Sequence, residues 1–192
     1  IGSSAMKLVE LKERKGEYSL QRLGIEPLSP EAIVDGSIMD SSLVVDAIHK
    51  LNDATGATLP SYATSLSGHS VIIKKIQIER VKEQQARELM RWEAEQHVPF
   101  DMESVELDFQ ILDPNGTDDQ MSVLLVAAKR ELVEAKVRVL TDAGLSAAAV
   151  DVDAFALHNA FERNHPEAMN GIVALVNVGH EVTNINIVED GV

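Results

Sequence analysis

Two short segments combine glycine with small polar side chains, as phosphate-binding turns do. They are Ile1-Gly-Ser-Ser-Ala-Met-Lys7 and Asn177-Val-Gly-His-Glu-Val-Thr183. Glycine lets the backbone approach a phosphate, amides and hydroxyl groups donate hydrogen bonds, and a lysine supplies a point charge. A plain hairpin turn accounts for either segment taken alone. The candidate phosphate-binding residues are Gly2, Ser3, Ser4, Lys7, Asn177, Gly179 and Thr183.

Other catalytic and metal-binding patterns are missing from the sequence. The chain has no cysteine, no His-x-x-x-His pair, no Walker loop and no Gly-x-Ser-x-Gly segment. His49 and His158 fall within predicted helices and His97 near the end of one, where surface or packing roles are the simpler interpretation. The pair Asp151 and Asp153 is most simply a strand-to-helix cap. We therefore predict no catalytic residue and no metal site.

The composition predicts a globular cytosolic protein. The 192 residues are 45% hydrophobic and 25% charged, which is enough to bury a core. No stretch approaches the roughly 18 apolar residues of a membrane span, and no signal peptide is recognisable. A net charge of −14 argues against a nucleic-acid partner. The absence of cysteine fits a reducing compartment and excludes disulfides.

The first phosphate candidate lies at the start of a predicted series of strands. Residues 6–12 and 18–25 form a hairpin, and 32–38 a third strand. A helix runs between the capping Asp40 and Gly56. Residues 62–66 form a further strand, parallel to the first. This order of strands and helix begins a ribonuclease-H-like half.

A compact α+β unit is predicted next, from helical and alternating apolar patterns. The helix before Pro99 gives way to a strand, because proline lacks an amide hydrogen and disfavours the helical conformation of its predecessor. A strand at 121–128 pairs with it across the turn at 113–116, and a helix follows. The predicted buried residues of that second helix are Leu132, Val133, Val137 and Leu140.

The chain then returns to the first half through a strand at 147–152 and a helix at 153–164. Residues 171–178 are a continuous apolar run, which is typical of a strand in a sheet covered on both faces. This strand carries the second phosphate candidate at its end. The chain starts inside a strand-turn and stops in a hairpin turn, so we expect it to be a fragment.

One segment resembles a known family. Arg91-Trp-Glu-Ala-Glu-Gln-His-Val-Pro-Phe100 is similar to the RWEAEQ-aromatic-IPF signature of the PilM family, actin-like cytoplasmic proteins of type IV pilus assembly. Further segments resemble the family in the same order, and together they extend along the whole chain. They are residues 1–11, 24–27, 32–36, 124–128 and 150–157.

The resemblance implies an α/β fold: an actin-like (ribonuclease-H-like) first domain with an inserted small α+β subdomain of the SHS2 type, truncated at the start of the second actin-like half. The implied boundaries are 1–80 for the first part, 81–146 for the insertion, 147–170 for the return and 171–192 for the second domain. The two glycine turns would be the phosphate loops of an ATPase. ATP and Mg²⁺ would bind in the full-length parent, and this fragment would hold neither.

Two departures from the family pattern concern the second loop. Asn177 stands where an aspartate is usual and is a poorer magnesium partner. Glu181 would repel a phosphate if its side chain pointed inward. The alternatives are a sugar- or acetate-kinase-like phosphotransferase, whose catalytic carboxylate we cannot locate, and an actin-like cell-division protein, which the segment 91–100 disfavours.

The resemblance further implies an adaptor at the inner membrane that binds the cytoplasmic N-terminal tail of PilN, and possible contacts with other pilus inner-membrane and motor proteins. The groove between the insertion and the first half would take this peptide. Arg91 and Glu95 share a helix face and could hold polar groups of the peptide, while Trp92 or Pro99 could line an apolar pocket. Alternatively, Trp92 is core and Arg91–Glu95 an exposed ion pair worth about 0.3–0.5 kcal/mol.

Overall fold

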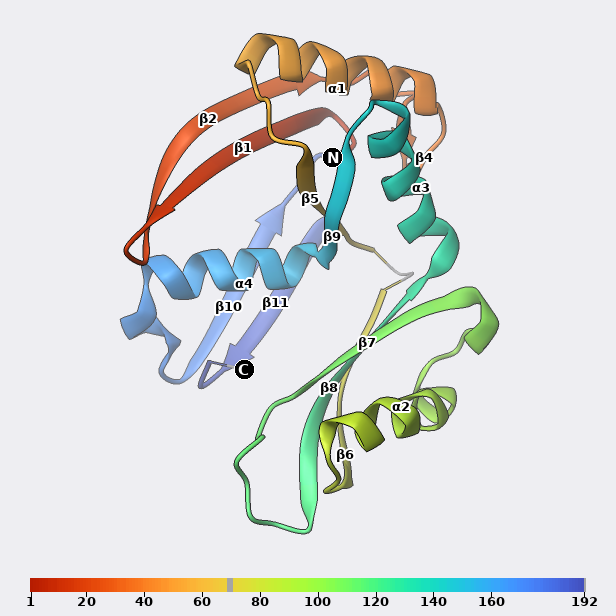
Figure 1. The fold of residues 1–192 in the computed structure, drawn as a ribbon, viewed down its shortest axis with the longest axis vertical. Helices are drawn as coiled ribbons and strands as arrows, with labels where there is room; N and C mark the ends of the chain where they lie inside the picture. The colour runs from red at the N-terminus through yellow and green to blue at the C-terminus, as the bar shows by residue number, and fades with distance from the viewer. Residues whose placement is uncertain (69–70, 192) are drawn as a thin grey trace. The chain divides into compact units, whose positions relative to one another are not determined.

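The computed structural model of the chain describes residues 1–68 and 71–191. The chain divides into two compact units, one made of Ile1–Gly68 and Ala135–Val192 and the other of His69–Glu134 (Figure 1). Each unit has its own apolar core.

The first unit opens with the predicted hairpin. Strand β1 (Ala5–Arg14) pairs antiparallel with β2 (Glu17–Pro27). Met6 and Leu8 on one face are buried in a core shared with helix α1 (Ser41–Thr55). The opposite face leaves large apolar side chains more than half exposed, namely Val9, Leu11, Leu20, Leu23 and Ile25.

Helix α1 begins and ends where the sequence predicts. The Asp40 carboxylate accepts hydrogen bonds from the amides of Ser42 and Leu43, at 2.9 and 3.2 Å. Gly56 ends the helix in the left-handed conformation, with φ of 63°. Asp40 thus satisfies amides that the first turn leaves without helical partners, and Gly56 adopts a conformation that costs other residues more.

The predicted single strand at 32–38 is wrong. The structure has two short strands, β3 (Ile33–Val34) and β4 (Ser37–Ile38), paired as a tight hairpin. Asp35 and Gly36 between them have φ of 50° and 77°. Positive φ at both central residues reverses the chain direction, so an extended strand cannot continue through them.

Strand β5 (Ser61–Leu66) forms where the sequence predicts a strand, and it pairs in parallel with β9 (Ser146–Val152). Strand β1 hydrogen-bonds to β2 among the described residues, and the parallel orientation of β5 to β1 stays a prediction. Helix α4 (Asp153–Asn164) follows β9 directly and has the predicted bounds. The apolar pattern of residues 62–66 predicts a strand, but it does not specify which edge that strand joins.

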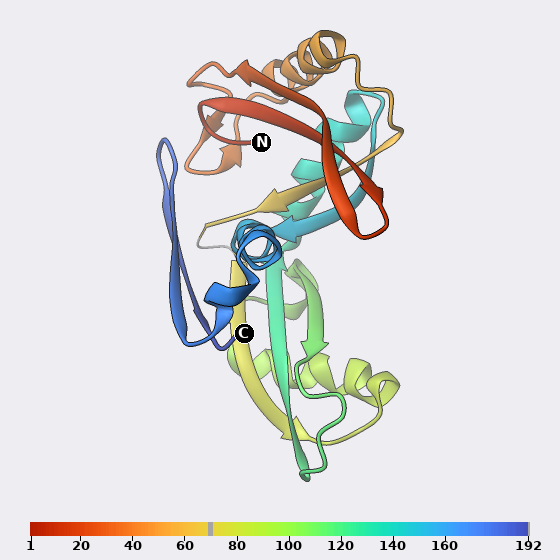
Figure 2. The ribbon, with the colours of Figure 1, turned by 90° about the vertical axis from the view of Figure 1, so that its left-hand side faces the viewer.

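The last elements of the first unit are η2 (Pro166–Met169) and the antiparallel hairpin of β10 (Ile172–Val178) and β11 (Thr183–Glu189). Figure 2 shows this hairpin as a two-stranded ribbon. The prediction that residues 171–178 are covered on both faces is wrong, because Ile172 is 74% and Val178 77% exposed. One side of the hairpin packs through Leu175, Val188 and neighbours on Met169 and α4.

The second unit is a three-stranded antiparallel sheet with one helix on it. Its strand order is β6 (Val71–Glu79), β8 (Gln120–Lys129), β7 (Val105–Ile111), and the described strands of this sheet pair only with each other. Helix α2 (Glu83–His97) and η1 (Met102–Ser104) precede β7. Side chains at alternate positions of the strands meet the buried residues of α2 in one core: Ile76, Ile78, Ala86, Met90, Ala94, Val98, Val105, Met121, Val123, Leu125 and Ala127.

Arg80, after β6, fixes the long connection from β7 to β8. Its guanidinium pairs with the Asp113 carboxylate at 2.7 Å and donates to the carbonyl oxygens of Asp118 and Gln120 at 2.7 and 2.9 Å. Desolvation alone would raise the pKa of Asp113, but hydrogen bonds from Arg80 and the Ser122 amide outweigh it and hold that pKa below its ordinary value. The connection is therefore ordered by charge-assisted hydrogen bonds.

The predicted buried face of α3 (Arg130–Asp142) needs correction. Lys136, Val139 and Leu140 are buried, whereas Leu132, Val133 and Val137 are only partly covered. Leu140 is buried as predicted, and the buried stripe continues from Lys136 through Val139 and Leu140 to Ala143, so that Val137 lies beside it. A lysine therefore occupies a core position.

Candidate functional site

The first glycine turn is ordered by its own backbone. The Gly2 amide donates to the Ala5 carbonyl at 3.2 Å, and β1 begins directly afterwards. Lys7 is exposed on β1, and within residues 1–68 and 71–191 its ammonium makes no ion pair or hydrogen bond. Lys7 is therefore available to an anionic ligand.

The second glycine turn joins β10 to β11. The Gly179 amide donates to the Val182 carbonyl at 3.0 Å. A Cβ atom at Gly179 would lie 2.6 Å from that carbonyl oxygen, so the turn itself requires glycine. Asn177 and Thr183 flank the turn and are exposed. No hydrogen bond or ion pair among the described residues joins this turn to the first, so their joint role as phosphate loops stays a prediction.

A cavity of about 360 Å³ lies beside Lys7 in the first unit. Its apolar wall comes from β1, α1 and α3 and includes Leu8, Leu51 and Leu140. Polar side chains lie along the rest of the wall, mostly on β5 and its neighbours. They are Lys7, Asn52, Tyr62, Thr64, Ser65 and Asp151.

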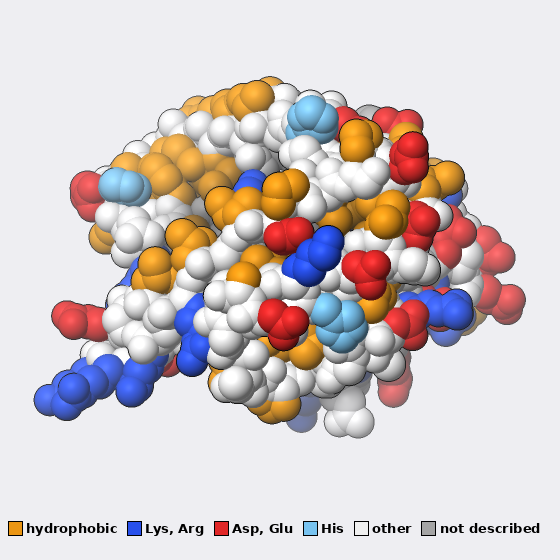
Figure 3. Space-filling view, turned by 90° about the horizontal axis from the view of Figure 1, so that it is seen from above, with side chains coloured by type: hydrophobic (Ala, Val, Ile, Leu, Met, Phe, Trp, Pro, Cys, Tyr) orange, Lys and Arg blue, Asp and Glu red, His pale blue; other side chains and the backbone are white. Residues whose placement is uncertain are grey.

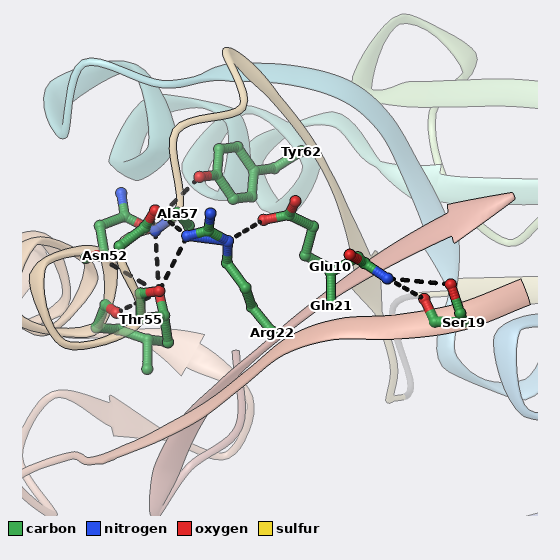
Figure 4. Close-up of polar contacts among 10 residues, drawn as sticks. Glu10, Ser19, Gln21, Arg22, Asn52, Thr55, Ala57 and Tyr62 are labelled. Carbon is green, nitrogen blue, oxygen red and sulfur yellow. Dashed lines mark hydrogen bonds and ion pairs between the residues drawn. The ribbon is translucent and has the colours of Figure 1, made fainter.

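Figure 4 shows a polar network at the end of α1 that shares Asn52 and Tyr62 with the wall of the cavity. Arg22 on β2 forms an ion pair with Glu10 at 2.9 Å and donates to the carbonyl oxygens of Thr55 and Gly56 at the end of α1. Tyr62 donates from its hydroxyl to the Asn52 side chain at 3.5 Å. Burial raises the pKa of Tyr62, and the Glu10 charge adds to this effect.

Lys136 was not predicted as a site residue, although its spacing places it on the buried stripe of α3. Its side chain is buried, and its ammonium donates to the Ile1 carbonyl at 3.3 Å. Burial lowers the pKa of Lys136, and the nearby Asp153 carboxylate opposes that shift. The signal in the sequence is a charged residue three and four positions before Val139 and Leu140.

The four residues predicted to bind a peptide lie in the second unit. Arg91, Trp92 and Glu95 are exposed on α2, and Pro99 is exposed just beyond its end. Trp92 is 69% exposed, which excludes the interpretation that it is core. Neither Arg91 nor Glu95 makes an ion pair with a described residue, so the predicted alternative of an Arg91–Glu95 pair is not formed.

The described residues contain no cluster of three or more His, Asp or Glu side chains that could hold a metal ion. None of the helices in residues 1–68 and 71–191 is both long and apolar enough to cross a membrane.

These features define a mixed α/β protein with a separate sheet-and-helix unit and two glycine turns at strand ends. The whole chain, residues 1–192, matches the family of the type IV pilus assembly protein PilM. The chain belongs to that family.

Solved structures similar to this chain include the following two. A chain of a PilM-PilN type IV pilus biogenesis complex is 28% identical, with a TM-score of 0.88 over 99% of this chain and 56% of that one. This chain therefore spans about half the length of that relative. The cytoplasmic domain of EpsL, an inner membrane component of the type II secretion system of Vibrio cholerae, is 18% identical, with a TM-score of 0.53 over 97% of this chain and 71% of that domain. At this level of identity, the similarity to the EpsL domain concerns the fold alone.

Proposed function

We propose that this chain acts in type IV pilus assembly as a cytoplasmic adaptor that binds the N-terminal tail of PilN and is held at the inner membrane through that partner. Membership of the PilM family supports the proposed role in type IV pilus assembly. The similar solved structure is a PilM-PilN complex, which supports the partner.

The observation that carries the proposal is the outer surface of α2. Three chemically different groups are exposed there within five positions: the Arg91 guanidinium, the Trp92 ring and the Glu95 carboxylate. An aromatic side chain that the fold does not bury is a typical anchor for a protein partner, and arginine commonly accompanies it. The helix holds its position through the buried Met90 and Ala94 on its other side, so the outer groups are presented on a rigid element.

The charge of the chain bears on which peptide fits. The net charge is −14, although Figure 3 shows basic as well as acidic side chains among hydrophobic ones on the face viewed from above. A basic or neutral peptide with a few apolar anchors is therefore favoured over an acidic one. Burial of the anchors, rather than rim charges, supplies most of the affinity.

A synthetic peptide with the N-terminal sequence of the cognate PilN tests the proposal by calorimetry. Arg91→Ala is expected to weaken binding, because it removes charge-assisted hydrogen bonds to the peptide. Lys74→Ala, which removes an exposed cation from β6 of the same unit, is the matched control and leaves binding unchanged. Equal affinities for Arg91→Ala and Lys74→Ala, with both variants folded, would place the peptide elsewhere.

We further propose that a longer parent chain binds ATP through its phosphates. The supporting observation is Lys7, an exposed cation uncommitted to other described residues, next to the Gly2 turn and beside the cavity. Lys7 and the amides of the two glycine turns would hold the phosphates, and Gly179 permits the tight turn there. Among the described side chains there is no group of three or more acidic or histidine residues, so a magnesium ion would take most of its ligands from the phosphates and water.

A further inference from the structure

Two asparagines of the chain are followed directly by glycine. They are Asn115, in the connection from β7 to β8, and Asn170, between η2 and β10. Both asparagines and both glycines are exposed to solvent. An Asn-Gly pair is chemically reactive, because glycine has no Cβ atom to shield its backbone nitrogen from the preceding side chain. The two pairs share this local chemistry, so a difference between them has to come from the fold.

The reaction at such a pair is loss of the side-chain amide group. The glycine nitrogen gives up its proton to solvent hydroxide and attacks Cγ of the asparagine. A bond forms between that nitrogen and Cγ, the bond from Cγ to Nδ2 breaks, and ammonia leaves with a proton from water. Water then opens the succinimide ring to aspartate or isoaspartate. Charges and hydrogen bonds beside the glycine nitrogen therefore set the rate.

At Asn115 the glycine nitrogen donates to a neutral acceptor. The Gly116 amide donates a hydrogen bond to the Asp113 carbonyl oxygen at 3.0 Å. The Asp113 carboxylate lies close to Gly116, but the Arg80 guanidinium pairs with that carboxylate at 2.7 Å and lies against Gly116 as well. The ion pair leaves little net charge beside the glycine nitrogen. Loss of the amide proton here breaks only an ordinary neutral hydrogen bond.

At Asn170 a carboxylate holds the glycine nitrogen. The Gly171 amide donates to Asp190 Oδ1 at 2.8 Å, and the Asp190 amide donates back to the Gly171 carbonyl at 2.9 Å. Within residues 1–68 and 71–191, no ion pair neutralises the Asp190 carboxylate. A negative nitrogen beside that carboxylate is disfavoured, and the charge-assisted hydrogen bond is the stronger one to break.

We propose that Asn115 is a site of spontaneous deamidation in the folded chain, whereas Asn170 is protected by Asp190. Either product puts a new carboxylate into the acidic connection of residues 113–119, which Arg80 orders. Isoaspartate also inserts one more carbon into the backbone of the turn, so that the hydrogen bond across it is lost. The modification is irreversible without an enzyme, and it loosens the connection from β7 to β8.

The whole chain is incubated in mildly alkaline buffer, and both sites are followed by mass spectrometry of proteolytic peptides. In the native chain, Asn115 is expected to deamidate roughly 3- to 10-fold faster than Asn170, the factor that separates a neutral from a charge-assisted hydrogen bond. In urea the two sites should react at similar rates, because only their sequence neighbours remain. Labelling by an isoaspartyl methyltransferase distinguishes isoaspartate from aspartate in the modified peptide.

Asp190→Gly is the matched variant. Asp190 has φ of 48°, a conformation that glycine adopts without strain. The variant should raise the rate at Asn170 to near that of Asn115 and leave Asn115 unchanged. Asn115→Ser should abolish the modification in the peptide that contains this position.

Three results would overturn the proposal. They are native rates at Asn170 equal to those at Asn115, the same ratio of rates in urea as in the native chain, and a native Asn115 that stays intact while the urea sample reacts. An Asn170 that stays slow in folded Asp190→Gly would refute the protective role of the carboxylate. If Asp190→Gly does not fold, the native and urea rates of the wild type still decide.

Discussion

Replacing Trp92 with alanine should weaken peptide binding while leaving the fold intact. The ring is 69% exposed, so the folded chain gains little from burying it. We expect the free energy of unfolding to change by no more than about 0.5 kcal/mol, as for other surface substitutions. The partner peptide, by contrast, would cover this ring.

The expected loss of affinity follows from the accessible area. A tryptophan side chain buries roughly 150–250 Å² when covered, so the exposed part of Trp92 offers about 100–170 Å² to a partner. At about 25 cal/mol per Å² this amounts to an upper bound of roughly 2.5–4 kcal/mol. Ordering the ring and the peptide costs some of that gain, which leaves about 2 kcal/mol, or roughly a 30-fold weaker Kd for Trp92→Ala.

Calorimetric titration with the PilN peptide and chemical denaturation measure the two quantities separately. Met90→Ala, two positions away on the buried side of α2, is the contrasting variant, since its side chain is 1% exposed. Deleting that side chain should cost about 2–5 kcal/mol of stability. If Trp92→Ala binds the peptide as wild type does, or loses as much stability as Met90→Ala, the assignment of the α2 surface is refuted.

Three further results are expected. Lys7→Ala should weaken ATP binding by a longer parent chain roughly 10- to 100-fold in calorimetry, because a charge-assisted hydrogen bond is lost; equal affinity would remove Lys7 from the site. Asp40→Ala should cost about 1 kcal/mol and lower the unfolding midpoint by about 2–4 °C, since the cap of α1 is lost, and an unchanged midpoint would argue against that cap. Asp113→Asn should remove a pH dependence: because the folded pKa of Asp113 is lowered, its contribution is present above about pH 4 and is lost as the pH falls through the folded pKa. The gap between wild-type and Asp113→Asn midpoints should therefore narrow in acid, and a constant gap would contradict the Arg80 interaction.

The elements that sequence predicts well are those whose signals are local. Asp40 and Gly56 bound α1 through chemistry confined to one helical turn. Pro99 follows the end of α2, where the apolar period changes from helical to alternating. Helical spacing likewise places Arg91 and Glu95 on one face of α2, whereas it leaves open whether Trp92 is buried, and the exposure of Trp92 comes from the structure.

Other features depend on parts of the chain that are distant in sequence. The partner of β5 is β9, some eighty residues further along, and periodicity carries no information on that choice. The exposure of β10 depends on which elements pack against it, whereas its apolar run looks the same in a buried or an open sheet. The Asp35-Gly36 hairpin was available in the sequence, since Asp-Gly between apolar residues is a strong turn signal.

The candidate site residues show the same contrast between local sequence signals and contacts with distant parts of the chain. Lys7 and Gly179 could be named as candidate phosphate-binding residues from the sequence, because the signal of a tight turn lies within a few neighbouring residues. Lys136 could not be named from its spacing alone, since its burial depends on residues distant in sequence, such as Ile1, whose carbonyl accepts its hydrogen bond. The apolar pattern on α3 selects Val137 rather than the neighbouring Lys136.

The most direct test of the PilN-binding proposal uses the single tryptophan of the chain as its reporter. Because Trp92 is largely exposed, its emission in the free chain is that of a solvated indole. Titration with the PilN N-terminal peptide should shift the emission to shorter wavelength and saturate, as the ring leaves water. Saturable binding by calorimetry with no change in the emission of Trp92 would contradict the proposed surface, and the absence of binding by either method would contradict the function.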